Sequence, residues 1–149
     1  MNLSNLADDV IREEYVRRFT IPAGETIRSA ESAANHFRGY FADAQKQERF
    51  VVCFLNGQNQ ILTTEALFEG SLTSSAVYPR EVVGRVLELG AAAVVLAHNH
   101  PSGSTVVSSH DRQVTKKLQT ALESIDVRVL DHIVIGGEHY TSFADSGIL

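Results

Sequence analysis

The sequence has one cysteine, three prolines and no tryptophan in 149 residues. A disulfide needs two cysteines, so Cys53 alone excludes a disulfide framework and a zinc site built on cysteines. A single cysteine suits a reducing cytosol, and we therefore expect a cytoplasmic protein. No stretch approaches the roughly 20 apolar residues that cross a bilayer, so no membrane partner is expected. Met1–Val10 contains two aspartates where a signal peptide needs a basic start and an apolar run.

Positive charge is also scarce. The chain has 13 Lys and Arg against 18 Asp and Glu, which gives a net charge of −5. This balance argues against a protein that coats nucleic acid through bulk charge, because phosphate binding needs clustered Lys and Arg. It does not exclude a small local basic patch. A length of 149 residues with 44% hydrophobic side chains predicts one globular domain with a substantial core.

Hydrophobic periodicity and turn signals predict alternating helices and strands in an α/β domain. Hairpins at two places imply that the single sheet is mixed, with helices flanking it. An apolar strand such as Val51–Leu55 is expected to lie at an edge, where it could pair with another chain; the oligomeric state stays open. The predicted helices are 2–19, 29–44, 79–89 and 108–124, and the predicted extended segments are 49–55, 60–64, 66–68, 71–77, 91–97, 127–135 and 138–143.

Local signals support the predicted ends of these elements. Ser29 is a helix N-cap, and Pro79 begins a helix that Gly90 ends. Asn56-Gly57 is typical of a tight hairpin turn. The run 91–97 is wholly apolar, which predicts a central strand covered on both faces.

The chemistry-bearing residues follow this apolar strand. His98 and His100 are two residues apart on extended chain, so their imidazoles project to the same side. Asp111 lies in the first turn of the next helix and can return a carboxylate to the same point. Two imidazoles and a carboxylate match the ligands of zinc and leave one position open for water. Taken singly, His-x-His is a weak signal, Asp111 fits a helix-start acid and Ser108 fits an N-cap.

The joint pattern resembles the JAMM (MPN+) metalloprotease motif, Glu…His-x-His-x7-Ser-x-x-Asp. The segment from His98 to Gly103 resembles the RadC-like branch of that superfamily, as do residues 78–83, 91–100 and 126–136. The resemblance covers roughly residues 29–149 and leaves 1–28 as an accessory helix and linker. It implies the cytidine-deaminase-like sandwich fold of the JAMM/MPN domains.

The resemblance also implies roles for individual residues. His98, His100 and Asp111 would be the ligands of a Zn²⁺ ion. Ser108 would hydrogen-bond the bound water or the tetrahedral intermediate, and Glu48 would be the general base. By sequence alone, three other glutamates rival Glu48, although each fits a role in a helix or at the surface: Glu65, Glu69 and Glu81.

The implied function is hydrolysis of an amide, peptide or isopeptide bond, with a peptide or protein substrate. The alternative is a DNA-repair-associated or protein-binding module whose metal site is structural or vestigial. Nuclease action, which the His-Asn-His string suggests, is disfavoured because an apolar strand precedes the string and a helix follows it. The segment before Ser29 has no room for the helix-hairpin-helix module of larger RadC proteins.

The chain departs from the RadC pattern in two places. Tyr78 stands where RadC proteins often have histidine, and Val106-Val107 stands where a proline often precedes the motif serine. Neither change removes a ligand.

The remaining polar residues have simpler interpretations. His110 is expected at the surface near substrate, His132 in the core or against a ligand, His36 and His139 at the surface, Cys53 in the core, and Asn99 tying the loop to its neighbours.

Overall fold

A five-stranded mixed sheet forms the centre of the protein. The fold is that of a computed structural model, which describes residues 3–44, 46–70 and 77–149. In order across the sheet, the strands are β2 (Ile61–Glu69), β1 (Arg49–Leu55), β3 (Ala93–Asn99), β4 (Arg128–Gly136) and β5 (His139–Ser142). The pair β3 and β4 is parallel. The mixed sheet confirms the prediction from sequence.

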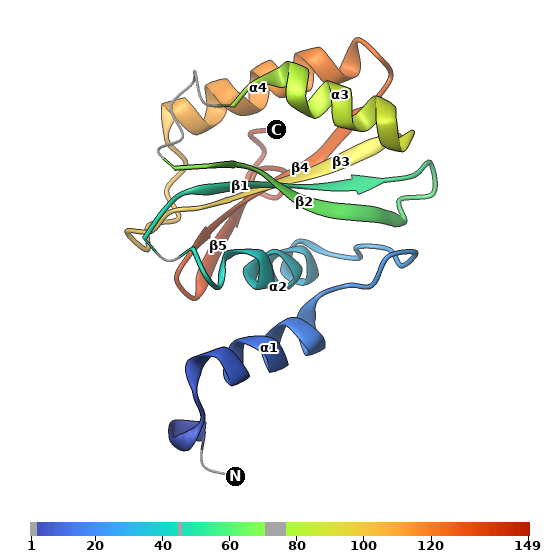
Figure 1. The fold of residues 1–149 in the computed structure, drawn as a ribbon. Coiled ribbons are helices and arrows are strands. Elements are labelled where there is room, and N and C mark those ends of the chain that lie inside the picture. Colours follow the sequence, from blue (N-terminus) through green and yellow to red (C-terminus); the bar gives the residue numbers. More distant parts are fainter. Residues whose placement is uncertain (1–2, 45, 71–76) are drawn as a thin grey trace.

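Helices cover both faces of this sheet (Figure 1). α2 (Ala30–Phe41) lies on one face, and α3 (Pro79–Leu89) and α4 (Ser109–Glu123) lie on the other. A short 3₁₀ helix (Leu3–Asn5) precedes α1 (Asp8–Phe19), which lies outside α2. The architecture is therefore the predicted α/β sandwich in a single domain. None of the described helices is long and apolar enough to span a membrane.

Alternation along β1 divides the core into two layers. Val52 and Phe54 pack with α3 and α4, whereas Val51 and Cys53 pack with α2. This is the period of two that a strand gives when both of its faces are covered. β3 is buried along its whole length, as the apolar run predicts, and it extends two residues further, through the first histidine of the motif. Burial raises the pKa of the Cys53 thiol to about 11, consistent with an unreactive core side chain.

The helix ends follow the local signals in the sequence. Ser29 caps α2 by accepting a hydrogen bond from the amide of Ser32, whose own side chain completes the capping box. Pro79 is the first residue of α3, and Gly90 ends that helix in the left-handed region at φ 67°. These predictions are confirmed.

The first hairpin differs from a two-residue Asn-Gly turn. β1 and β2 are joined through Asn56–Gln60, and the positive φ falls on Asn59, at 60°, and not on Gly57. The side-chain oxygen of Asn56 accepts from the amides of Gln58 and Gln60 at 2.9 and 3.0 Å. This asparagine closes a longer loop through its side chain. The extended segment predicted over 71–77 lies outside the described residues except for Val77.

Two predictions about position are wrong. Val51–Leu55 is not an edge strand, because β1 lies between β2 and β3 in the sheet. His36 is not at the surface: it is buried in α2, where Nδ1 accepts from the amide of Ile21 at 2.7 Å and Nε2 lies 2.9 Å from Thr64 Oγ1. Burial lowers the pKa of His36 to about 4, so this histidine is neutral at pH 7.

The N-terminal segment is attached to the rest of the domain at several points. The Tyr15 hydroxyl donates to the carbonyl of Asn35 in α2. Further along, the amide of Gly24 donates to Ile61 O at 2.8 Å, and the amide of Ile61 donates to Glu25 O at 2.9 Å. The linker thus continues the hydrogen bonding of β2. A domain boundary at residue 28 stays a prediction.

Candidate metal centre

His98 and His100 stand at the end of the central strand. β3 holds His98 between Phe50 of β1 and Val134 of β4, and His100 follows one residue after the strand ends. Their rings lie 4.8 Å apart between centroids, and the two Nε2 atoms are 3.0 Å apart. The alternation of extended chain therefore brings both imidazoles to one side, as the spacing predicts.

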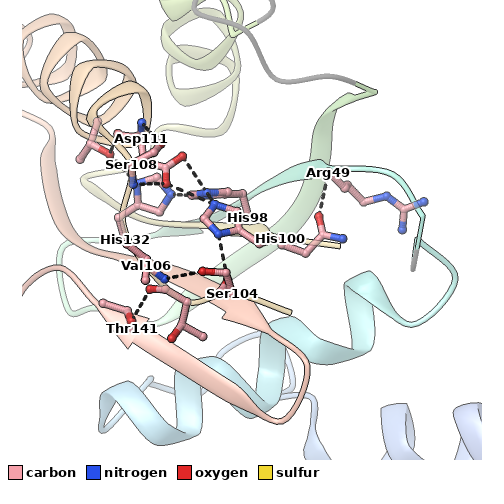
Figure 2. A network of polar contacts seen from close by, with 12 residues as sticks. Arg49, His98, His100, Ser104, Val106, Ser108, Asp111, His132 and Thr141 are labelled. Atoms are coloured by element: carbon pink, nitrogen blue, oxygen red, sulfur yellow. Dashed lines mark hydrogen bonds and ion pairs between the residues drawn. The ribbon is translucent and has the colours of Figure 1, made fainter. Parts of the chain in front are cut away.

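Asp111 reaches the same point from α4 (Figure 2). Its Oδ1 lies 3.1 Å from His98 Nε2, and its Oδ2 lies 3.2 Å from His100 Nε2. The three ligand atoms lie within 4.8 Å of one another, a spacing that could hold a metal ion. The carboxylate is oriented by a capping box: the amide of Ser108 donates to Asp111 Oδ2, and the Ser108 hydroxyl accepts from the Asp111 amide. One side chain therefore both starts the helix and faces the histidines.

The electrostatics of the cluster favour an ionised carboxylate. Burial alone would raise the pKa of Asp111, but the contacts of its carboxylate with the imidazoles of His100 and His98, which are favourable when those rings are protonated, outweigh burial and hold that pKa well below its usual range. The same contact with Asp111 raises the pKa of His100, against the effect of burial. The carboxylate favours a positive charge on the neighbouring imidazoles, in the form of a bound proton. A divalent cation would supply that positive charge in place of the proton.

The outer nitrogen of His100 shows which form of the ring faces the cluster. His100 Nδ1 lies 2.9 Å from the carbonyl oxygen of Ser104, an atom that only accepts hydrogen bonds. The proton of the neutral ring is therefore on Nδ1, and the lone pair of Nε2 points at Asp111 and His98. Two imidazole nitrogens and one carboxylate oxygen facing a common point fit a zinc ion with an open fourth position.

Asn99 points away from the two histidines and stabilises the approach to β1. Its side-chain oxygen accepts from the amide of Arg49 at 2.7 Å, and its nitrogen donates to the carbonyls of Ala44 and Gln47 at 2.9 Å each. This confirms the expected tie between the motif and a neighbouring loop. The loop leads directly to Glu48.

Glu48 lies on the histidine side of the sheet edge by register. Phe50 pairs with His98 in the antiparallel β1–β3 ladder, so two further residues place Glu48 opposite His100. The negative charge of Glu48 makes a small contribution to the raised pKa of His100, after that of Asp111. Both observations agree with a carboxylate beside the cluster, and its role as general base stays a prediction.

The rival glutamates have other surroundings. Glu65 forms a bidentate ion pair with Arg85, with two contacts of 2.8 Å. Glu69 pairs with Arg49 at 2.7 Å, and Glu81 is exposed in the first turn of α3. Arginine partners occupy the first two carboxylates away from the histidines.

Three supporting residues were missed by sequence reasoning. They are Ser104, whose carbonyl orients His100; Thr115, which joins Asp111 to His132; and Gly136, against which the loop after His100 packs. Thr115 has the only sequence signal, since it stands one helical turn after Asp111. The expected exposure of His110 is also wrong, because this residue is partly buried and its Nε2 is enclosed without a partner in the part of the chain described. Its contact with substrate stays a prediction.

Gly136 permits a close approach that a larger residue would block. A Cβ at this position would lie 2.6 Å from both Gly103 O and Ser104 O. We expect Gly136→Ala to cost about 1–3 kcal/mol of stability, because backbone must move. The displaced Ser104 carbonyl should also weaken zinc binding about 10-fold or more through His100, measured by chelator competition.

Gly84→Ala is the matched control for this variant. Gly84 lies within α3 and a Cβ there meets no atom within 4 Å, so alanine should stabilise the helix by about 0.5–1 kcal/mol. Zinc affinity should not change. Equal zinc affinity in Gly136→Ala and Gly84→Ala would contradict a role for the Ser104 carbonyl in orienting His100.

A broad groove runs beside His100. Its volume is about 1100 Å³, and it is bounded by α1, by the loop after α2 and by the motif residues after β3. Side chains of both charges line it, namely Arg12, Lys46, Asp8 and Asp43. Of the three residues that converge at the candidate metal centre, His100 lines this groove.

The fold and this site together define a mixed α/β domain with a potential metal centre at the end of its central strand. The family model of the RadC-like JAB domain matches residues 27–148. The chain therefore belongs to the RadC-like JAB domain family.

Similar proteins carry names that state no activity. UPF0758 protein YfjY of Escherichia coli (strain K12) is 44% identical over 126 residues, which are 85% of this chain and 78% of that protein. UPF0758 proteins of Thiobacillus denitrificans and Vibrio parahaemolyticus are 45% and 44% identical over 127 and 128 residues. The chain covers 56% and 57% of those two longer relatives.

Proposed function

We propose that the protein is a zinc-dependent hydrolase of amide, peptide or isopeptide bonds. The observation that supports this most is the convergence of His98, His100 and Asp111 within 4.8 Å, each with an acceptor atom turned inward. When bound there, a zinc ion would polarise the substrate carbonyl and acidify water. Three protein ligands leave it an open position, which distinguishes a catalytic site from a closed structural one.

The protein's own side chains would carry the proton transfers. Glu48 takes a proton from the attacking water and delivers it to the leaving nitrogen as the C–N bond breaks. The Ser108 hydroxyl accepts from the Asp111 amide, and its own proton can be donated to the carbonyl oxygen as negative charge develops. Asp111 and Ser108 are held by each other, so the donor is oriented before substrate arrives.

The groove beside His100 supports a polypeptide as substrate. A volume of about 1100 Å³ at the edge of the cluster accommodates several residues, whereas a small-molecule site would be more enclosed. Mixed charges along its walls suit a peptide backbone with polar side chains. We propose that a peptide or protein segment lies in this groove with its scissile bond near His100.

A peptide library provides the direct test of this function. Protein loaded with one equivalent of zinc should cleave members of a library of peptides and lysine-linked isopeptides, with products identified by mass spectrometry. Removal of zinc by a chelator should abolish cleavage, and added zinc should restore it. Zinc-loaded protein that cleaves no peptide, isopeptide or simple amide would contradict the proposal.

Two N-cap serines separate helix capping from catalysis. Ser29 and Ser108 occupy equivalent positions, each accepting from the amide three residues later. Ser29→Ala and Ser108→Ala should each cost about 1 kcal/mol in thermal unfolding. Only Ser108→Ala should lower kcat, by about 100-fold, because it also removes an oxyanion donor. Equal kcat values for the two variants would leave Ser108 as a cap only.

A second candidate function is a DNA-associated module. One observation favours it: four cationic side chains are exposed along α4 and at the start of α3 in an otherwise acidic chain, namely Arg80, Arg112, Lys116 and Lys117. Duplex DNA should then bind at about 50 mM salt and weaken steeply by 200 mM. The absence of binding at low salt would exclude this candidate and leave the hydrolase unaffected.

A further inference from the structure

We propose that Thr115 and His132 are positioning residues that hold His98 in the tautomer required for metal binding. This inference rests on the proposed function, because it assigns the pair a purpose in the zinc site. It arises from a continuous line of hydrogen-bonding atoms that runs from the backbone of α4, through the core, to the outer nitrogen of His98. Figure 2 shows His132 and His98 at the metal-site end of this line.

The α4 end of this line determines which atom of each contact donates its proton. Thr115 Oγ1 donates to the carbonyl of Asp111 at 2.7 Å. A hydroxyl has one proton, so Thr115 Oγ1 must accept at its other contact, 2.5 Å from His132 Nδ1. His132 therefore carries its proton on Nδ1 and has its lone pair on Nε2.

The same alternation of donor and acceptor atoms continues to the metal site. His132 Nε2 lies 2.7 Å from His98 Nδ1, so the lone pair of His132 accepts and His98 donates. The proton of His98 is then on Nδ1, and its Nε2 lone pair faces Asp111 and His100. A metal ligand must present a deprotonated nitrogen, and this is the nitrogen that faces the site.

The ring of His132 lies in a largely aromatic part of the core. The ring is buried, stacked on Phe143 with centroids 4.6 Å apart and met at its edge by Phe50 at 5.6 Å. A charged imidazolium would be costly there, so His132 is neutral and carries a single ring proton. With that proton on Nδ1, Nε2 can only accept a hydrogen bond. If the Thr115 proton turned toward His132, every proton in the line would reverse and His98 would present N–H to the metal.

The two ligand histidines are thus oriented by equivalent means. His100 donates its Nδ1 proton to a backbone carbonyl directly, at Ser104. His98 Nδ1 contacts His132 instead of a carbonyl oxygen, and His132 and Thr115 connect it to the carbonyl of Asp111 through two side chains. Outer partners of this kind typically change metal affinity by 10–100-fold when they are removed.

Thr115→Val tests the inference, because valine retains the shape and removes the hydroxyl. His132 would lose the acceptor for its Nδ1 proton and gain by moving that proton to Nε2, which forces the His98 proton onto its own Nε2. We expect zinc affinity to fall about 10–100-fold in competition with a fluorescent chelator. Long-range ¹H–¹⁵N NMR of the metal-free protein should show His98 change from the Nδ1–H to the Nε2–H tautomer.

Two further variants make the result specific. Thr120→Val is the same substitution at an exposed site on the same helix, and it should leave zinc affinity and the His98 tautomer unchanged. His132→Gln places a carbonyl oxygen where Nε2 stood, so it should keep more zinc affinity than His132→Leu. Thermal unfolding of each metal-free variant checks that the fold is retained.

The outcomes separate this inference from the proposed hydrolase. A Thr115→Val protein with wild-type zinc affinity and an unchanged His98 tautomer would overturn the inference and leave the hydrolase intact. A wild-type protein that binds no zinc would contradict the hydrolase, and an Nε2–H tautomer of His98 in that metal-free protein would overturn the inference as well. Zinc-loaded wild type with His98 protonated on Nδ1, and the expected loss in the valine variant, supports it.

Discussion

Glu48→Gln is expected to lower kcat by about 10²–10⁴-fold and to leave zinc affinity unchanged. Glutamine has the size of glutamate but cannot take a proton from water, so the general-base contribution disappears. Glu48 does not belong to the group of three side chains that could hold the ion. We therefore expect the loss of its charge to leave metal affinity nearly unchanged. The measurement is single-turnover cleavage of a library-derived peptide, alongside a zinc titration of the same preparation.

The rival glutamates provide the matched controls for this variant. Glu65→Gln and Glu81→Gln make the same change of atoms at a carboxylate paired with Arg85 and at an exposed helix start. Both should keep kcat within about threefold of wild type, because neither carboxylate belongs to the proposed reaction. A normal kcat in Glu48→Gln would contradict the assignment of the base. A large loss in Glu65→Gln would transfer the assignment to that residue.

Asp111→Asn is expected to abolish hydrolysis and to weaken zinc binding by more than 100-fold. The substitution removes the anionic member of the proposed ligand set, and an amide oxygen is a poor replacement for a carboxylate on zinc. An effect larger than the 10–100-fold typical of outer partners is therefore expected. Asparagine still offers an oxygen to the amide of Ser108, so the start of α4 should be preserved.

Folding and metal binding can be separated in this variant by direct measurement. Circular dichroism of the metal-free protein should match that of wild type, and the loss of the favourable helix-dipole interaction should cost about 0.3–1 kcal/mol. Asp145→Asn, the same change at an exposed side chain, should leave zinc binding and cleavage intact. Wild-type zinc affinity in Asp111→Asn would mean that the ion, if bound, is held elsewhere.

Much of the fold follows from local features of the sequence. β1 spans Arg49–Leu55 in the structure, as its β-branched and aromatic run predicts. α3 begins and ends at Pro79 and Gly90 because both residues act on their own backbone. The pairing of strands is different, since it depends on residues far apart in the chain. The misplacement of β1 at an edge has this origin: its partner β3 begins nearly forty residues after β1 ends.

The candidate site likewise has features that follow from the local sequence and features that depend on residues far apart in the chain. The positions of His98 and His100 follow from the period of a strand, and the place of Asp111 follows from the first turn of a helix. His36 was misplaced because its partners, Ile21 and Thr64, lie 15 and 28 residues away, and nothing in α2 itself marks it as satisfied. A buried histidine is acceptable only where such partners exist, and these come from the tertiary structure.

The capping box of α4 has a consequence for how an ion enters the site. Ser108 and Asp111 hold one another through two hydrogen bonds that belong to the helix and need no metal. The carboxylate is thus immobilised when the chain folds, so little conformational entropy is left to lose on loading. Uptake of the cation should resemble lock-and-key association, with a rate governed by shedding of its hydration shell instead of by a slow isomerisation of the polypeptide.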